Sequence, residues 1–229
     1  MAGIVRKTRV ELAGVIFDLD GVVVDSHPVH VMAWKTLFAS LGKKVSDGDL
    51  SFVLDGHKRD TILRHFLGEL GADELKEYGE RKATLYRETA TELKTIAGLG
   101  GFMDAVEAAG LPMAVASSAG RARVEHTLNA LGIAKRFRTV VTGDDVAASK
   151  PDPAVFQLAA RELGVKAESV LVCEDAVAGV EGAKRAAMKC LAIAANGRGP
   201  LLKQAGADCV VTDFTQVSLD ELRGLFGNQ

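Results

Sequence analysis

Short apolar runs alternate with helical patterns along most of this chain, and this alternation constrains the fold more than any other feature. Beyond residue 95 the strand-like runs are MAVASS, RTVVTG, SVLVCED, KCLAIA and DCVVTD, with segments of helical spacing between them. Strands that alternate with helices form parallel sheets, because each helix carries the chain back across the sheet. The run AGVIFD near the N-terminus adds a strand of the same kind. The sequence therefore predicts an α/β fold with a Rossmann-like parallel sheet and helices on both faces.

The segment 28–94 differs from the rest, because we find no convincing strand there and its apolar residues recur at helical spacing. Its first helix is expected to begin near Ser26 and to stop at Gly42, since serine favours the N-cap and glycine the C-terminal end. Two more helices are predicted over 59–67 and 73–93. These patterns predict a helical insertion.

The predicted strands lie on both sides of this insertion. At 229 residues the chain has room for one sizeable core and a smaller appended domain. We expect an α/β catalytic core domain formed by residues 1–27 and 95–229, with residues 28–94 forming a helical cap domain. The glycine-rich segment 95–101 is interpreted as the return linker to the core.

Charge and hydropathy exclude several kinds of partner. The chain has 28 Lys and Arg against 30 Asp and Glu, so it offers no basic surface of the kind that binds nucleic acid. No apolar run approaches membrane-spanning length, and the first residues lack the apolar stretch of a signal peptide. We expect no nucleic acid partner, no membrane partner, a cytoplasmic location, and a monomer or weak dimer.

The densest chemical signal is the motif FDLDGVVVDS, which follows the first predicted strand. Ligands of open parallel sheets bind at the carboxyl ends of the strands, so these acids lie where a site is expected. Asp18 and Asp20 are separated by one residue and therefore point to the same side of an extended chain. A turn in which aspartates bind nearby backbone groups explains a lone DxDG at least as well, so other acids must support a functional interpretation.

A second acidic pair, Glu174 and Asp175, follows the run SVLVC at another strand end of the same predicted sheet. Carboxylate oxygens from separate strands suit Mg²⁺, a hard cation that prefers oxygen ligands, and without a cation the acids would repel one another. The alternative for Asp175 is an N-cap on the following helix. Together with the first motif, the pair favours a Mg²⁺ site.

Two further strand ends carry groups that suit a phosphate. Ser117 and Ser118 close the run MAVASS, where a hydroxyl and the first amides of the next helix can donate to phosphate oxygens. Lys150, in AASKPDP, supplies a cation for the charge of a phosphoryl-transfer transition state. Each signal is weak alone, since serines cap helices and lysines are usually solvated. Their order at successive strand ends makes them informative.

Together these motifs resemble those of the haloacid dehalogenase superfamily of phosphatases and phosphomutases, in the branch with a helical cap inserted after the first motif. The resemblance runs from about Ala13 to Ala194. It includes, in order, DLDGVVVDS, Ser117, Lys150 before PDP, and CEDAVAGVEGAKRAAM. It implies a Mg²⁺-dependent phosphatase or phosphomutase that acts on a small phosphorylated metabolite.

The resemblance also implies a role for each motif residue. Asp18 would be the nucleophile and form an aspartyl phosphate, and Asp20 would be the general acid and then the base. The second acid favours phosphate chemistry over carbon–halogen cleavage, because dehalogenases of the superfamily lack it. The metal ligands would be Asp18, the backbone carbonyl of Asp20, Asp175 and, directly or through water, Glu174. The phosphoryl-binding residues would be Ser117 and Lys150, with Ser118 as a further candidate.

Specificity in this family depends largely on the cap, where three stretches resemble the β-phosphoglucomutase group. They are His30-x-x-x-Trp34-Lys35, Gly56-His57-Lys58-Arg59 and Arg81-Lys82. By this resemblance His30, Arg59 and Lys82 are candidates for substrate contacts. The alternative is that His30 is a packed helix residue and that Arg59 and Lys82 are solvated charges. This alternative is less favoured for Arg59, because Arg59 follows a loop glycine. The histidines assigned to surface or packing positions are His57, His65 and His126.

The chain departs from the mutase pattern just after the serine of the second motif. It reads Ala119-Gly120-Arg121 where the mutases carry a polar serine and asparagine that hold a second phosphate. This departure favours a phosphatase of a small sugar phosphate or related metabolite. A β-phosphoglucomutase that interconverts glucose 1-phosphate and glucose 6-phosphate is the alternative.

Two other classes of protein share part of this sequence pattern. A nucleotide-binding oxidoreductase shares the alternating pattern, but no strand is followed by a convincing GxGxxG. A non-catalytic metabolite-binding protein on the same fold is possible in principle, because fold does not fix function. The presence of every chemical group of the four motifs argues against it.

Overall fold

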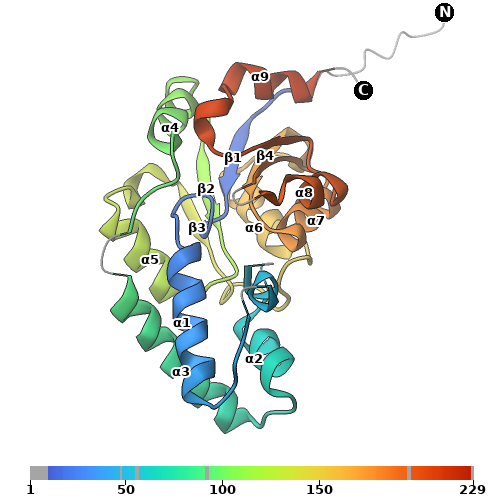
Figure 1. Ribbon diagram of the computed structural model, residues 1–229. Coiled ribbons are helices and arrows are strands. Elements are labelled where there is room, and N and C mark those ends of the chain that lie inside the picture. The colour runs from blue at the N-terminus through green and yellow to red at the C-terminus, as the bar shows by residue number, and fades with distance from the viewer. Residues whose placement is uncertain (1–9, 47, 55–56, 91–92, 195–196, 228–229) are drawn as a thin grey trace, which may run out of the picture.

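A computed structural model of the protein describes residues 10–46, 48–54, 57–90, 93–194 and 197–227. In this part of the chain six parallel strands form one sheet in the order β3-β2-β1-β4-β5-β6 (Figure 1). The strands are β1 (Gly14–Phe17), β2 (Met113–Ala116), β3 (Thr139–Val141), β4 (Val170–Glu174), β5 (Lys189–Ile193) and β6 (Cys209–Val211). The N-terminal strand β1 thus lies between β2 and β4, and the predicted parallel α/β sheet is confirmed.

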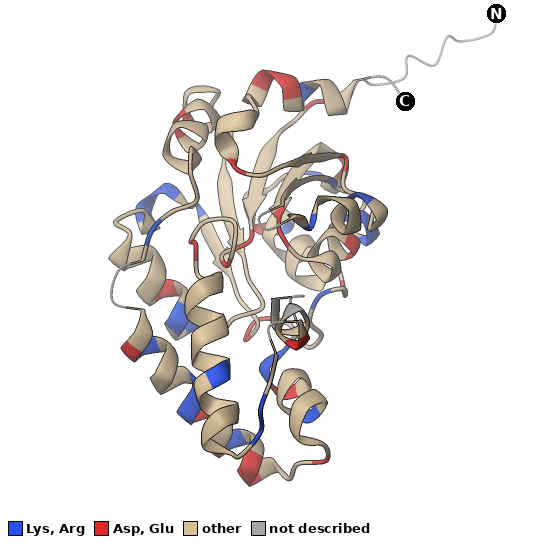
Figure 2. Cartoon of the chain, viewed as in Figure 1, with Lys and Arg blue, Asp and Glu red and all other residues tan. Residues whose placement is uncertain are grey.

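Helices cover both faces of this sheet (Figure 1). The α-helices are α1 (His27–Ser40), α2 (Arg59–Leu67), α3 (Ala72–Thr89), α4 (Leu99–Ala108), α5 (Arg121–Ala130), α6 (Ala154–Leu163), α7 (Val177–Arg185), α8 (Gly199–Gln204) and α9 (Leu219–Arg223). The short 3-10 helices are Asp49–Leu54, Ala134–Arg136, Ala167–Ser169, Phe214–Gln216 and Gly224–Phe226. Figure 2 shows Lys and Arg interspersed with Asp and Glu along these elements.

The two faces of the sheet are buried in separate apolar clusters, because successive side chains of a strand point to opposite faces. In β1, Phe17 packs with Phe102 of α4 on one face, whereas Ile16 belongs to the cluster that contains Phe156 of α6 on the other. All four residues of β1 are buried. A strand buried on both faces reads as a continuous apolar run, which is why AGVIFD is recognisable in the sequence.

Helices α1 to α3 have an apolar core of their own, in which Trp34 and Phe38 of α1 pack with Leu63 of α2 and Leu75 of α3. These helices lie beyond the carboxyl ends of the strands (Figure 1). The insertion is therefore helical as predicted, while the exact limits of a cap domain stay a prediction.

Most of the observed helix boundaries agree with the boundaries predicted from the sequence. The helix predicted over 59–67 is confirmed as α2, and α1 has Ser26 as its N-cap and ends just before Gly42. The helix predicted over 73–93 is shorter, since α3 ends at Thr89. The proposed linker 95–101 is wrong in its last residues, because α4 begins at Leu99.

Among the described residues, no helix combines the length and the apolarity needed to cross a bilayer. The first residues of the chain, on which the signal-peptide expectation depends, lie outside the described part.

Candidate active site

The predicted site residues converge at the carboxyl end of the sheet. Asp18 directly follows β1, Ser117 follows β2, and Glu174 ends β4 with Asp175 after it. Together with Lys150 they line a cavity of about 870 Å³ that also reaches the helices of the insertion. Segments far apart in the sequence are joined here because neighbouring parallel strands end at the same edge.

Lys150 is the buried cation of this cluster. Its Nζ donates to Asp18 Oδ1 at 2.5 Å, to Glu174 Oε1 at 2.5 Å and to the carbonyl oxygen of Ala116 at 3.1 Å. Burial alone would lower the pKa of this ammonium, but Asp18 and Glu174 raise it above its usual range. Lys150 therefore stays charged and partly neutralises the acids around it.

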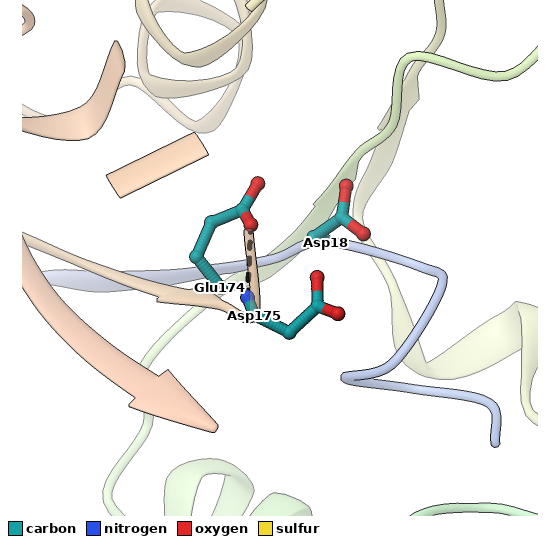
Figure 3. A group of neighbouring side chains, drawn as sticks. All are labelled: Asp18, Glu174 and Asp175. Atoms are coloured by element: carbon teal, nitrogen blue, oxygen red, sulfur yellow. Dashed lines mark hydrogen bonds between the residues drawn. The ribbon is translucent and has the colours of Figure 1, made fainter. Parts of the chain in front are cut away.

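Three carboxylates lie close enough to share one cation. Oxygens of Asp18, Glu174 and Asp175 all lie within 4.8 Å of one another (Figure 3). Burial raises the pKa of Asp18 well above its usual range, and the neighbouring carboxylates add to this against the effect of Lys150. One ammonium is thus too little positive charge for these acids, and a further cation would lower the pKa of Asp18.

The donor set fits a hard divalent cation. All three side chains offer oxygen, the ligand that Mg²⁺ prefers. Asp175 Oδ2 is buried and pairs with His27 Nε2 at a distance of 2.7 Å. Burial raises the pKa of Asp175, and His27 only partly offsets this effect. Because these buried acids have too little positive charge around them, the space between their oxygens is a position for a cation.

Two glycines leave room for the acids. Gly21 has a φ of +75°, and a Cβ there would lie 2.2 Å from Asp175 Oδ2. A Cβ at Gly179 in α7 would lie 1.9 Å from the carboxyl carbon of Glu174. Neither position accepts a side chain while the carboxylates keep these places.

Glu174 has more hydrogen-bond donors than the other two acids of this cluster, Asp18 and Asp175. Its Oε1 accepts from Lys150, and its Oε2 accepts from the amides of Asp175 and Ala176 at 2.9 and 3.1 Å. Because both oxygens already accept hydrogen bonds, this side chain orients Lys150 and also the loop that follows β4.

Ser117 and Ser118 follow β2, which flanks β1 on the side opposite to β4. Ser117 is buried, and its hydroxyl accepts a hydrogen bond from the amide of Ala119 at 3.1 Å. Both serines line the cavity. The structure brings them together with Asp18 and Lys150, as the motif order predicts.

Asp20 is surrounded by donors, unlike Asp18. Its Oδ1 accepts from Ser26 at 2.6 Å and from Arg123 at 2.9 Å, and His30 Nε2 lies 3.3 Å away. A second nitrogen of Arg123 contacts Oδ2. Burial would raise the pKa of Asp20, but Arg123, with help from His30, lowers it well below its usual range. The Asp20 carboxyl is ionised in this arrangement.

Two of the three cap candidates form a chain of contacts that ends at Asp20. Lys82 Nζ lies 2.7 Å from His30 Nδ1, and His30 in turn contacts Asp20. Burial lowers the pKa of His30 to about 4, with Lys82 contributing, so the ring is neutral. If Lys82 donates to Nδ1, then Nε2 carries the proton and donates to Asp20.

Arg59 lies elsewhere in the cavity wall. It begins α2, its side chain is half exposed, and its Nε donates to Asp60 at 3.1 Å. Its guanidinium lies against α3 at Gly79, where a Cβ would be 2.5 Å from it. The structure therefore places Arg59 on the cavity but does not join it to the contacts around Asp20.

Among the cavity residues that the sequence interpretation did not name as site residues are Arg123, Tyr86 and His27. Arg123 lies in the first turn of α5, which faces the strand ends, and this position was the available signal. Tyr86 follows Lys82 by four residues and so shares its face of α3. Of the histidines assigned to surface or packing positions, His57 and His126 line the cavity, and His57 also stacks on Phe52.

Lys82 makes stability depend on pH. Burial, reinforced by Arg123, lowers its pKa to about 7 from 10.5 in the unfolded chain. Between these values the unfolded state holds more protons, so the free energy of unfolding rises with pH. We expect wild type to gain about 2 kcal/mol over Lys82→Met between pH 7 and pH 9, measured by urea unfolding.

Lys76→Met is the matched control, because Lys76 is exposed on the same helix. Equal responses to pH in the two variants would contradict the burial of a charged Lys82.

Comparisons with known proteins agree with this geometry. The model of a family described as haloacid dehalogenase-like hydrolase matches residues 15–193. In an alignment of 236 positions the chain is 30% identical to the β-phosphoglucomutase of Mycobacterium bovis. The alignment covers 88% of this chain and 90% of that protein. The chain is 31% identical over 212 residues to hexitol phosphatase A of Escherichia coli, covering 90% of this chain and 93% of that protein.

Two other matches concern a longer protein and a solved structure. The protein Suppressor of quenching 1, chloroplastic, of Arabidopsis thaliana is 30% identical over 93% of this chain, which spans only 21% of that protein's length. The crystal structure of a β-phosphoglucomutase from Clostridium difficile superposes with a TM-score of 0.84 at 24% identity, covering 94% of this chain and 97% of the other. At that identity the likeness shows the fold.

Proposed function

Because the chain belongs to the haloacid dehalogenase-like hydrolase family, we propose that it is a Mg²⁺-dependent phosphatase that hydrolyses the phosphate ester of a small metabolite. The observation that carries this proposal is the convergence of Asp18, Lys150 and Asp175 at the carboxyl end of the sheet, with Asp20 in the same cavity. A carboxylate nucleophile, a buried cation and a second acid are the groups that phosphoryl transfer through an enzyme ester requires.

In the first half-reaction a carboxylate oxygen of Asp18 attacks the phosphorus, and the bond from phosphorus to the ester oxygen breaks. Asp20 is ionised while Arg123 binds it, so it must leave Arg123 and take up a proton from solvent before it gives that proton to the departing oxygen, which leaves as an alcohol. Lys150 and the hydroxyls of Ser117 and Ser118 hold the phosphoryl oxygens. The result is an aspartyl phosphate at Asp18.

In the second half-reaction water attacks the phosphorus of the aspartyl phosphate. Asp20, now a carboxylate, takes a proton from this water, and the bond from phosphorus to the Asp18 oxygen breaks. Inorganic phosphate and the free Asp18 carboxylate are formed. The same residue thus serves as acid and then as base.

Mg²⁺ would be held by Asp18, Asp175 and the backbone carbonyl of Asp20, where it would supply positive charge to the phosphoryl group. The hydrogen bonds that Glu174 already makes with Lys150 and two amides support a water-mediated role for it.

Hydrolysis is favoured over mutase chemistry by the loop after Ser118. Ala119 and Gly120 offer no polar side chain, and Arg121 pairs with Glu125 and Asp145. A mutase must retain a bisphosphate while it reorients, whereas a phosphatase only has to admit water. A β-phosphoglucomutase remains the second candidate, because a relative 30% identical carries that name.

The test is phosphate release with Mg²⁺ across a panel of sugar phosphates and phosphoglycolate, with β-glucose 1-phosphate also assayed for glucose 6-phosphate. We expect release from one or a few esters and a loss of about 10²-fold or more after chelation of the metal. Mg²⁺ should also raise the melting temperature, because ligands of the folded state stabilise it.

Formation of glucose 6-phosphate stimulated by a bisphosphate would instead establish the mutase. If neither reaction occurred, the non-catalytic alternative would hold. The cytoplasmic location and the monomer or weak dimer stay predictions.

A further inference from the structure

His27 lies between the first helix of the insertion and the acidic cluster. It is the first residue of α1, its side chain is only 13% exposed, and it lines the same cavity as Asp18 and Asp175. Its Nε2 lies 2.7 Å from Asp175 Oδ2. Phosphoryl transfer by Asp18 and Asp20 gives this imidazole no task of its own. The contact with Asp175 is therefore the feature that points to its role.

A tight loop after β1 brings the imidazole to this place. The amide of Gly21 donates to the carbonyl oxygen of Val24 at 2.8 Å, and the amide of Val24 donates to that of Leu19 at 3.0 Å. These hydrogen bonds turn the chain back on itself, so that α1 begins beside the strand ends. The position of His27 is thus set by the backbone of the loop that also carries Asp18.

Gly21 provides the space in which His27 and Asp175 meet. A Cβ at this residue would lie 2.6 Å from His27 Nε2 as well as 2.2 Å from Asp175 Oδ2. Both polar atoms therefore pack against the bare Cα of Gly21, the residue that follows Asp20. Since the carbonyl of Asp20 is one of the proposed metal ligands, the contact between His27 and Asp175 belongs to the same turn as the metal site.

The placement of His27 suits a partner of a metal ligand better than a ligand. Within the described part of the chain, the possible ligand atoms that lie within 4.8 Å of one another come from Asp18, Glu174 and Asp175 (Figure 3). His27 Nε2 is not in this group. A carboxylate has two oxygens, so Asp175 can accept from His27 at one oxygen and bind a cation with the other. Carboxylates that bind metals are commonly oriented by hydrogen bonds of this kind.

The ring of His27 can donate to Asp175 whether it is charged or neutral. A neutral imidazole keeps one N–H, and in the tautomer with hydrogen on Nε2 this N–H faces Asp175 Oδ2. Burial by itself would lower the pKa of His27, but Asp175 raises it above its usual range, as a carboxylate that accepts from an imidazole does. The contact therefore does not depend on a charge on the ring.

We propose that His27 is a positioning residue of the metal site, whose Nε2–H holds the Asp175 carboxylate so that its other oxygen, together with Asp18, receives Mg²⁺. The carboxylate is oriented before the cation arrives, so less side-chain freedom is lost on binding. Because His27 begins α1, the same contact joins the first helix of the insertion to the metal ligand that follows β4. This inference rests on the proposed Mg²⁺ site and adds a residue to it.

The experiment measures Mg²⁺ binding to the metal-free protein by calorimetry in wild type, His27→Leu and His27→Gln. His27→Leu keeps a side chain of similar size but has no N–H, and its dissociation constant for Mg²⁺ should rise by about 10- to 100-fold. His27→Gln keeps an N–H donor and should restore most of the wild-type affinity. Melting temperatures measured over a range of Mg²⁺ concentrations confirm that each variant is folded and follow the weaker binding.

His126→Leu is the matched control, because His126 lines the same cavity but is exposed on α5, and this variant should bind Mg²⁺ as wild type does. Unchanged or tighter Mg²⁺ binding in His27→Leu, or an equal loss in His27→Gln, would overturn the proposal. These measurements need no turnover. Binding that depends on His27 without hydrolysis of any ester would refute the proposed phosphatase alone, whereas a wild type that binds no Mg²⁺ would refute the metal site and this role together.

Discussion

Replacement of Asp18 by asparagine should abolish phosphate release, with a loss of about 10⁴-fold or more in kcat. The amide cannot form the acyl phosphate, and no other acid of the cluster takes its place. Glu174 is already bound by Lys150 and two amides, and Asp20 is bound by Arg123. The loss should appear with every ester that wild type accepts.

The same variant should remain folded. Burial and the neighbouring carboxylates raise the pKa of Asp18, so a neutral amide of the same shape is tolerated at this position without metal. We expect a free energy of unfolding within about 1 kcal/mol of wild type in urea. Asp25→Asn is the control, because Asp25 is exposed in the same motif. Full activity in Asp18→Asn would remove Asp18 from its proposed role.

Replacement of Lys150 by methionine should destabilise the protein by about 3–5 kcal/mol. The substitution removes an ammonium 2.5 Å from both Asp18 and Glu174 and leaves these buried carboxylates facing one another. The cost comes from the uncompensated charges, since methionine fills a similar volume. Turnover should fall by about 10²- to 10³-fold at the same time, because a cation for the phosphoryl group is lost.

Denaturant unfolding with and without Mg²⁺ separates these effects. Mg²⁺ should restore part of the lost stability in Lys150→Met, because it neutralises the same carboxylates. Lys184→Met is the matched control: Lys184 pairs with Asp208 at 2.6 Å but is one-third exposed, so its loss should cost about 1 kcal/mol or less. Equal costs for the two lysines would contradict the charge balance assigned to the site.

The sequence predicted two kinds of feature: the repeated alternation of strands and helices, and the residues whose side chains carry a functional group. The strand β1 was recognisable because both of its faces are buried, and Asp18 and Asp175 were named as candidates because each directly follows a strand. Lys150 lies in the loop between β3 and α6 and was named from the motif around it. Both signals are local, so a single sequence contains them.

Features that depend on tertiary packing were missed. The glycines at the start of α4 read as a linker, yet Leu99, Phe102 and Met103 bury this helix against the sheet, and packing outweighs the weak helix propensity of glycine. Arg123 lies 103 residues from Asp20 in the chain, and no local pattern predicts that the two meet. Ion pairs of this kind are visible only once the fold is known.

The tight fit of the acids against Gly21 and Gly179 has a consequence for inherited variation in this chain. Both positions lack any reactive atom, yet a single methyl group at either one would displace a carboxylate of the site. Damage to catalysis therefore need not remove a chemical group, and a survey that scores only charged or polar positions would overlook both glycines.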